Sequence, residues 1–321
     1  MRIVYFGTPE FAASQLEAIL AAGYEVAAVV TAPDKPAGRG KQMRASEVKE
    51  CALRHGLPLL QPEKLKDEAF VGQLRSFNAD LFVVVAFRML PEVVWSMPPK
   101  GTINLHASLL PQYRGAAPIN HAIINGETET GLTTFLLDKE IDTGAMIMQE
   151  KMPIGEKMNA GELHDALMNL GNDVIVKTIK MIESGNVELR SQNYVIEKEN
   201  IVLKPAPKIF KDDCYIDWKK SGKEIYNFVR GLSPYPAAHA KMQNSSGEIL
   251  DLKVFETELA SKSGKNDEIF GLKTDKKTFL EVVLKDSCIK IIEIQQAGKK
   301  AMPIAEFLRG TRISEDWKLV L

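Results

Sequence analysis

The sequence has few residues that could form disulfides or zinc clusters. Only three cysteines are present among the 321 residues, namely Cys51, Cys214 and Cys288. Their number is odd, and they are scattered without paired spacing or an adjacent histidine. Disulfide frameworks and zinc clusters need such pairs. We therefore expect three buried thiols and no metal site.

Long apolar runs are missing as well. No stretch of the chain stays apolar over the roughly 20 residues that a membrane-spanning helix needs. Residues 1–7 read directly as a strand, which leaves no room for the charged, apolar and cleavage regions of a signal peptide. These observations predict a cytoplasmic protein without a membrane partner.

The chain also lacks an excess of charge of one sign. It has 41 Lys and Arg residues against 42 Asp and Glu residues, a formal charge of −1. Residues 205–321 carry 20 basic and 17 acidic side chains, a balance of +3, and residues 1–204 carry 21 and 25, a balance of −4. Attraction of a polyanion to the whole molecule is thus excluded, and any binding of nucleic acid depends on local patches.

Strand-like and helix-like segments alternate along the first half of the chain. The strand-like segments are 3–6, 25–30, 81–86, 102–106 and 132–137, and the helix-like segments are 9–21, 45–55, 67–77 and 159–183. This alternation predicts an α/β domain with a mainly parallel sheet covered on both faces. Ligands of such sheets bind beyond the carboxyl ends of the strands.

Residues 7–11 (Gly-Thr-Pro-Glu-Phe) end the first strand and raise the hypothesis of a dinucleotide site. Only one glycine stands where the dinucleotide fingerprint has three, and Pro9 lacks the N–H that would face the phosphates. A tight turn with proline at the start of a helix fits these residues better.

The composition changes near residue 190. Residues 191–207 show no helical period and end in Lys-Pro-Ala-Pro, which predicts an extended linker. After it come a helix-like segment at 220–229, strand-like runs at 250–255, 269–272, 279–284 and 289–294, and a helix start near Pro303. Short strands of this kind predict a small, OB-like β-barrel. We therefore expect domains at 1–189 and 208–321, joined by a linker at 190–207.

Two groups of basic residues could contact a polyanion. Residues 33–44 hold four basic side chains and one acidic side chain, and their Gly and Pro residues predict an irregular loop. In the second domain, a basic face could include Lys285, Lys290, Lys299 and Lys300. Each group could bind phosphates or could simply be solvated surface.

The residues with the clearest chemistry lie near predicted strand ends. Asn104 and His106 are two apart in an extended segment, so they share one face, and the segment 141–144 (Ile-Asp-Thr-Gly) supplies Asp142 from a loop. An amide and an imidazole can stabilise a tetrahedral oxyanion, and a carboxylate can orient the imidazole or accept a proton from an attacking amine. This trio predicts acyl transfer to an amine.

Three other functions can be compared with acyl transfer to an amine. With water in place of the amine, the trio would hydrolyse its substrate. The barrel and the basic loop could also form an RNA-binding protein without catalytic activity. Asp-Thr-Gly occurs in aspartic proteases, but that chemistry needs a second such carboxylate, and the chain holds no second triplet.

Three motifs in order resemble those of the folate-dependent formyltransferases: residues 104–111 (Asn-Leu-His-Ala-Ser-Leu-Leu-Pro), residues 113–119 (Tyr-Arg-Gly-Ala-Ala-Pro-Ile) and Asp-Thr-Gly at 142–144. Residues 7–11, 33–41, 206–209 and 296–302 also match the members of that family that act on aminoacyl-tRNA. The resemblance covers nearly the whole chain. It implies a Rossmann-like catalytic domain followed by an OB-like barrel.

The resemblance also implies a reaction and its residues. The formyl group of 10-formyltetrahydrofolate would pass to the α-amine of methionyl initiator tRNA, for translation initiation, on a monomeric enzyme without a metal. The implied catalytic residues are Asn104, His106 and Asp142. The implied folate-binding residues are Phe87, Arg88, Leu90, Ser108, Leu109, Leu110 and Pro111, and the tRNA-binding residues are Lys35, Arg39, Lys41, Lys299 and Lys300. Ala107 stands where the family usually has Gly, so this residue must avoid a positive φ.

Overall fold

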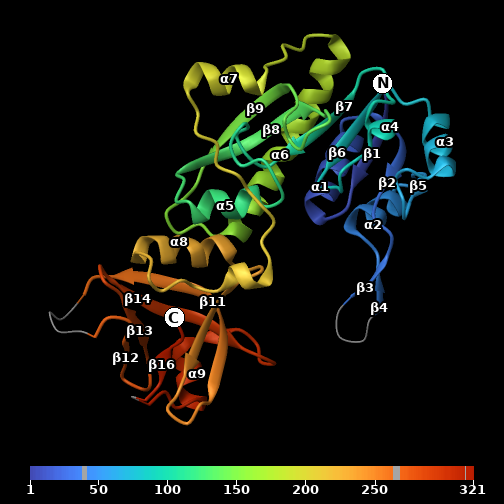
Figure 1. The fold of residues 1–321 in the computed structure, drawn as a ribbon. Helices are drawn as coiled ribbons and strands as arrows, with labels where there is room; N and C mark the ends of the chain where they lie inside the picture. The colour runs from blue at the N-terminus through green and yellow to red at the C-terminus, as the bar shows by residue number, and fades with distance from the viewer. Residues whose placement is uncertain (38–41, 263–267, 315) are drawn as a thin grey trace. The chain divides into compact units, whose positions relative to one another are not determined.

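The computed structural model describes residues 1–37, 42–262, 268–314 and 316–321 (Figure 1). The chain forms two compact units. The first contains residues 1–115, 129–153 and 164–205, and the second contains residues 116–128, 154–163 and 206–321. These units interleave along the chain, whereas the limits drawn at 1–189, 190–207 and 208–321 are sequential. Those limits stay a prediction.

The first unit is built on a seven-stranded sheet with the order β5-β2-β1-β6-β7-β8-β9. Its strands are β1 (Arg2–Gly7), β2 (Glu25–Val30), β5 (Leu59–Leu60), β6 (Leu81–Val85), β7 (Thr102–His106), β8 (Glu129–Leu136) and β9 (Met146–Pro153). Pairing is parallel from β5 to β7, and β8 and β9 are antiparallel. The predicted mainly parallel sheet is confirmed. The carboxyl ends of β1, β6 and β7 lie at one edge of it.

Helices cover both faces of this sheet. They are α1 (Glu10–Ala21), α2 (Glu47–Arg54), α3 (Glu68–Ser76), α4 (Glu92–Trp95), α6 (Ala160–Ser184) and α7 (Gln192–Glu199). On one face, Phe82 of β6 shares a core cluster with Phe70 of α3 and Val94 of α4. On the other face, the hydroxyls of Thr134 in β8 and Thr178 in α6 are 2.9 Å apart. Among the described helices, none combines the length and apolar character needed to cross a bilayer.

Two segments of the first unit differ from the sequence prediction. Helix α7 occupies part of the segment expected to be an extended linker. Only Gln192 and Val195 of its eight residues are buried, so the sequence shows no helical period. In the basic loop, β3 (Lys35–Ala37) pairs with β4 (Gln42–Arg44) in an antiparallel hairpin. The prediction of irregular structure was therefore wrong for these strands.

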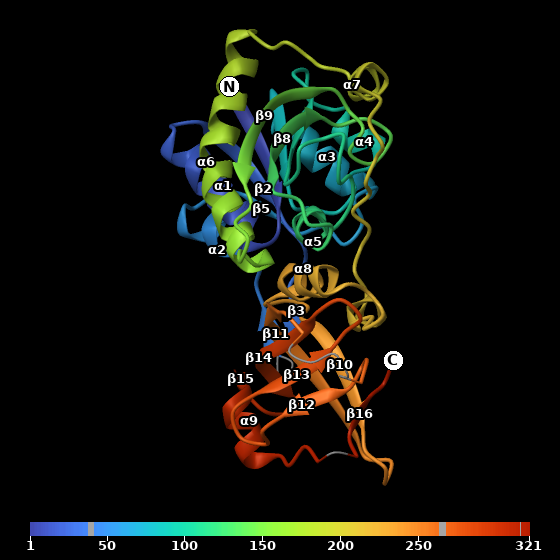
Figure 2. The same cartoon turned by 90° about the vertical axis from the view of Figure 1, so that its left-hand side faces the viewer.

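The second unit is built on an antiparallel sheet with the order β12-β13-β14-β11-β10-β16, and β15 pairs with β14 (Figure 2). Its strands are β10 (Ala238–Gln243), β11 (Ile249–Ala260), β12 (Leu272–Thr274), β13 (Leu280–Val283), β14 (Cys288–Gln296), β15 (Met302–Pro303) and β16 (Lys318–Leu319). The unit also holds α5 (Pro118–Ile124), a 3-10 turn (Lys211–Cys214), α8 (Gly222–Leu232) and α9 (Ile304–Gly310). Trp218, Val229, Ile291 and Phe307 share its core. The sheet is barrel-like, which confirms the predicted fold class.

Candidate active site

Asn104 and His106 lie near the carboxyl end of β7 and point to the same face of the sheet, while Ile103 and Leu105 are buried on the opposite face. The Asn104 side chain is half-buried and has no hydrogen-bond partner within the described part of the chain. An amide that is partly shielded from water and unpaired is suited to donate to a ligand. Ala107, directly after the strand, avoids a positive φ, as its side chain requires.

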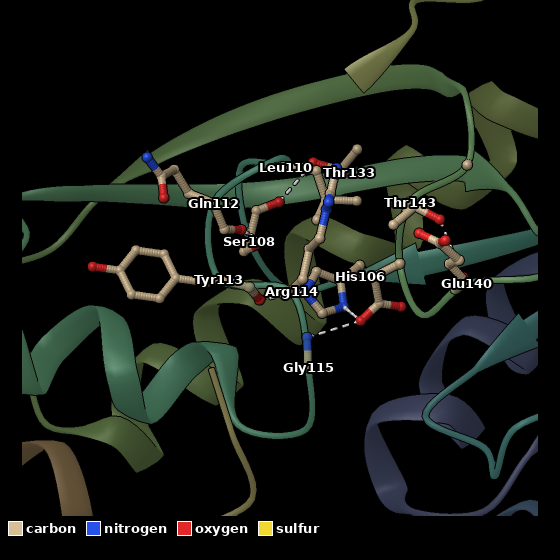
Figure 3. A network of polar contacts seen from close by, with 12 residues as sticks. His106, Ser108, Leu110, Gln112, Tyr113, Arg114, Gly115, Thr133, Glu140 and Thr143 are labelled. Carbon is tan, nitrogen blue, oxygen red and sulfur yellow. Dashed lines mark hydrogen bonds and ion pairs between the residues drawn. The ribbon is translucent and has the colours of Figure 1, made fainter. Parts of the chain in front are cut away.

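Both ring nitrogens of His106 have polar neighbours, and the residue is only 7% exposed. Figure 3 shows the ring beside the segment that contains Tyr113, Arg114 and Gly115. Nε2 lies 2.9 Å from the carbonyl oxygen of Tyr113. Because a carbonyl only accepts, Nε2 must carry the hydrogen of this bond. Nδ1 lies 3.8 Å from Oδ2 of Asp142 and is therefore the nitrogen that can exchange a proton.

Asp142 reaches His106 from the loop between β8 and β9. Its side chain is 12% exposed. Oδ2 accepts a hydrogen bond of 2.9 Å from the N–H of Gly115. The Asp142 backbone is left-handed, with a φ of 56°, which few residues other than glycine, Asn and Asp adopt. The loop also requires glycine at position 144, because a Cβ there would lie 1.7 Å from the carbonyl oxygen of Leu136.

Arg114 was not predicted, although it lies in the 113–119 motif. Burial lowers the pKa of its guanidinium, and the carboxylates of Asp142, Asp138 and Glu140 act in the opposite direction. Arg114 is therefore a cation held close to the carboxylate of the candidate site. Gln192, which bonds to Arg114, gave no signal in the sequence because its helix was read as a linker.

The predicted folate-binding residues fall into two segments. Phe87 is half-buried, with its ring 5.8 Å from that of Phe6. Arg88 is exposed and donates to the carbonyl oxygens of Pro62 and Glu63. Four of the other side chains are buried, namely those of Leu90, Ser108, Leu110 and Pro111, and that of Leu109 is half-buried. A ligand at the 108–111 turn would therefore meet mainly backbone groups, and the folate assignment stays a prediction.

Three of the five predicted tRNA-binding residues are exposed in the structure. Lys35 lies on β3, aligned with Arg44 of β4. Lys299 and Lys300 lie between β14 and β15 in the second unit. Arg39 and Lys41 lie outside the described residues. Contact of any of them with RNA stays a prediction.

One cluster in the first unit offers atoms that could bind a metal. Glu17 of α1 faces Cys51 and His55, one helical turn apart at the end of α2, with ligand atoms within 4.8 Å of one another. Arg54 already donates to Oε1 of Glu17 at 2.7 Å. Burial and the Glu17 carboxylate raise the pKa of Cys51 to about 11, so the thiol stays protonated at neutral pH. We interpret the group as a hydrogen-bonded cluster, in which Glu17 accepts from Cys51 and Arg54 and bonds to His55.

Two family models match the chain. The formyl transferase model matches residues 1–179, and the model of the formyl transferase C-terminal domain matches residues 208–312. The first model alone covers more than half of the chain. The chain belongs to the formyl transferase family.

Three relatives that match over nearly their full length are named methionyl-tRNA formyltransferase. The protein of Bacteroides fragilis is 51% identical over 320 residues, which cover 99% of this chain and 98% of the relative. That of Flavobacterium johnsoniae is 49% identical and covers 99% of both chains. That of Azobacteroides pseudotrichonymphae is 53% identical over 96% of this chain and 95% of the relative. The resemblance drawn from the motifs is confirmed, and this protein is a formyl-transferring enzyme.

Solved structures share the fold at low sequence identity. An N-formyltransferase from Helicobacter canadensis, in complex with folinic acid and dTDP-3-aminofucose, has a TM-score of 0.62 at 20% identity and covers 92% of this chain and 98% of its own. HypX from Aquifex aeolicus, in complex with tetrahydrofolic acid, has a TM-score of 0.59 at 17% identity and covers 96% of this chain and 47% of its own. These similarities support the two-unit fold.

The cluster of Glu17, Cys51 and His55 predicts that the thiol of Cys51 reacts slowly with alkylating reagents. Because the thiolate is the reactive form, a pKa of about 11 in place of 9.0 reduces its population at pH 8 by about a hundredfold. We expect iodoacetamide to modify Cys51 at least about a hundredfold more slowly in the folded protein than in urea. Peptide mass spectrometry over time measures both rates. Equal rates would contradict the description of the cluster.

Proposed function

We propose that this enzyme transfers the formyl group of 10-formyltetrahydrofolate to the α-amine of methionyl initiator tRNA, for translation initiation, and releases tetrahydrofolate. The observation that carries the proposal is the contact between His106 and Asp142 at the end of β7, with the unpaired amide of Asn104 on the same face. The names of the full-length relatives support the acceptor. Fold neighbours solved with folinic acid or tetrahydrofolic acid support the donor.

Asn104 stabilises the charge that develops on oxygen. Attack of the neutral amine on the formyl carbon forms a C–N bond and leaves a negative oxygen and a positive nitrogen. The amide of Asn104 donates to that oxygen, and one such donor typically lowers the barrier by about 3 kcal/mol. The half-buried position of Asn104 strengthens this hydrogen bond, because less water competes for it.

His106 and Asp142 act on protons. The Nε2–H of His106 is used by the Tyr113 carbonyl, so His106 acts through Nδ1, which donates to the oxygen when it bears a hydrogen. Asp142 accepts the proton of the attacking nitrogen, directly or through a water molecule. The bond from the formyl carbon to the folate nitrogen then breaks, and that nitrogen takes up the proton.

The remaining assignments complete the proposal. The folate surface comprises Phe87, Arg88, Leu90, Ser108, Leu109, Leu110 and Pro111, and the tRNA surface comprises Lys35, Arg39, Lys41, Lys299 and Lys300. Residues 1–189 form the catalytic domain and residues 208–321 the tRNA-binding domain. The enzyme works as a monomer in the cytoplasm, where its acceptor is made and used.

Asn104→Ala tests the oxyanion role. We expect kcat for formylation of methionyl initiator tRNA to fall by about 10²- to 10³-fold, with both KM values changed by less than about threefold, because the amide acts mainly on the adduct. Initial rates measure both constants, and Asn186→Ala, on the exposed segment after α6, serves as the control. Formate release at the same rate with and without tRNA would indicate a hydrolase instead.

Lys35→Ala tests whether strand β3 of the basic loop contacts tRNA. Because a lysine beside a phosphate acts on the polyanion, KM for the tRNA should rise about three- to tenfold while KM for the folate stays unchanged. The salt dependence of log kcat/KM should become shallower by about 0.7 to 0.9. The control is Lys180→Ala, an exposed lysine on α6. Equal losses for both substrates would refute the assignment.

A further inference from the structure

A side chain from a distant part of the sequence holds the loop that carries Asp142. Gln192, the first residue of α7, is 1% exposed. Its Nε2 donates to the carbonyl oxygens of Asp142, at 2.9 Å, and Gly144, at 2.8 Å. Both N–H groups of the amide are thereby used, and both hold the backbone of the Asp-Thr-Gly segment.

The other end of the same amide holds Arg114. Oε1 of Gln192 accepts from Nε of Arg114 at 3.0 Å and from Nη2 at 2.7 Å. The orientation of the amide is unambiguous, because the two carbonyls can only accept and the guanidinium can only donate. Every hydrogen-bonding position of Gln192 is therefore filled at a buried site.

The residues on either side of Arg114 contact the catalytic pair directly. The N–H of Gly115 donates to Oδ2 of Asp142, and the carbonyl of Tyr113 accepts from Nε2 of His106, both at 2.9 Å. Gln192 thus joins the backbone of Asp142 to the segment that orients both catalytic side chains.

Asp142 needs this support because no strand holds it. It lies in a loop with a φ of 56°, and its Oδ2 is 3.8 Å from Nδ1 of His106, beyond direct hydrogen-bond distance. A displacement of about 1 Å in such a group can reduce a rate by about a hundredfold.

We propose that Gln192 is a positioning residue for formyl transfer, which holds the Asp142 carboxylate at His106 without contacting either substrate. The inference rests on the proposed roles of Asp142 and His106. It assigns part of the rate to hydrogen bonds made by the first residue of helix α7.

Gln192→Met keeps the size and burial of the side chain but removes its hydrogen bonds. We expect kcat per folded enzyme to fall by about ten- to a hundredfold while both KM values change by less than about threefold. Gln192→Glu keeps the acceptor for Arg114 but turns an oxygen toward the two carbonyls, so a similar loss is expected. The matched control is Gln15→Met, another fully buried glutamine, which donates to the carbonyl of Met168 between α1 and α6 and should leave kcat unchanged.

A double-mutant cycle with Asp142→Asn separates positioning from a general structural effect. If Gln192 acts through Asp142, Gln192→Met should lower kcat in the wild type and have little further effect in Asp142→Asn. The positioning role alone would be overturned if the fold-losses of the two single variants multiplied in the double variant. A normal kcat for both Gln192 variants would overturn it as well. A normal kcat for Asp142→Asn would overturn the proposed catalytic site, and the positioning role with it.

Discussion

The candidate site depends on a histidine ring held between two fixed partners. The backbone carbonyl of Tyr113 takes the Nε2 hydrogen of His106, and the carboxylate of Asp142 faces Nδ1. Because the ring is nearly buried, it cannot turn to exchange these partners without displacing its neighbours. The tautomer is thus set by the fold, and one nitrogen alone is left for proton exchange. The segment 113–115 and the loop that carries Asp142 keep this arrangement in place.

A strand end and a loop share that task. The end of β7 fixes Asn104 and His106, as is usual for ligand sites of parallel sheets. Asp142 comes from a loop, and a catalytic group on a loop is only as well placed as the contacts that hold the loop. Here the N–H of Gly115 and the amide of Gln192 make those contacts. Gly144 allows the loop to pack closely against the carbonyl of Leu136, because glycine has no Cβ. The first unit therefore uses a helix 50 residues further along the chain to support the loop that carries Asp142.

Sequence reasoning succeeded where a pattern is local and regular. Strand-like runs that alternate with helix-like segments gave the strands at 25–30 and 102–106 with the bounds observed, and the Asn-x-His spacing placed two polar side chains on one face. It missed α7, because two buried residues in eight make no period, and with it the support from Gln192. It also missed the hairpin within residues 33–44, where Gly and Pro suggested irregular structure. Contacts between residues 50 or more positions apart, such as Gln192 with Asp142, leave no spacing to detect.

The protonation of His106 is the most direct test of this account. Nitrogen NMR of protein labelled with ¹⁵N in its histidines distinguishes a ring nitrogen that bears a hydrogen from one that does not. The account predicts that Nε2 of His106 carries a hydrogen in the folded protein, because it donates to the Tyr113 carbonyl. A neutral ring with its hydrogen on Nδ1 and a bare Nε2 would contradict it, since the Tyr113 carbonyl would then have no donor.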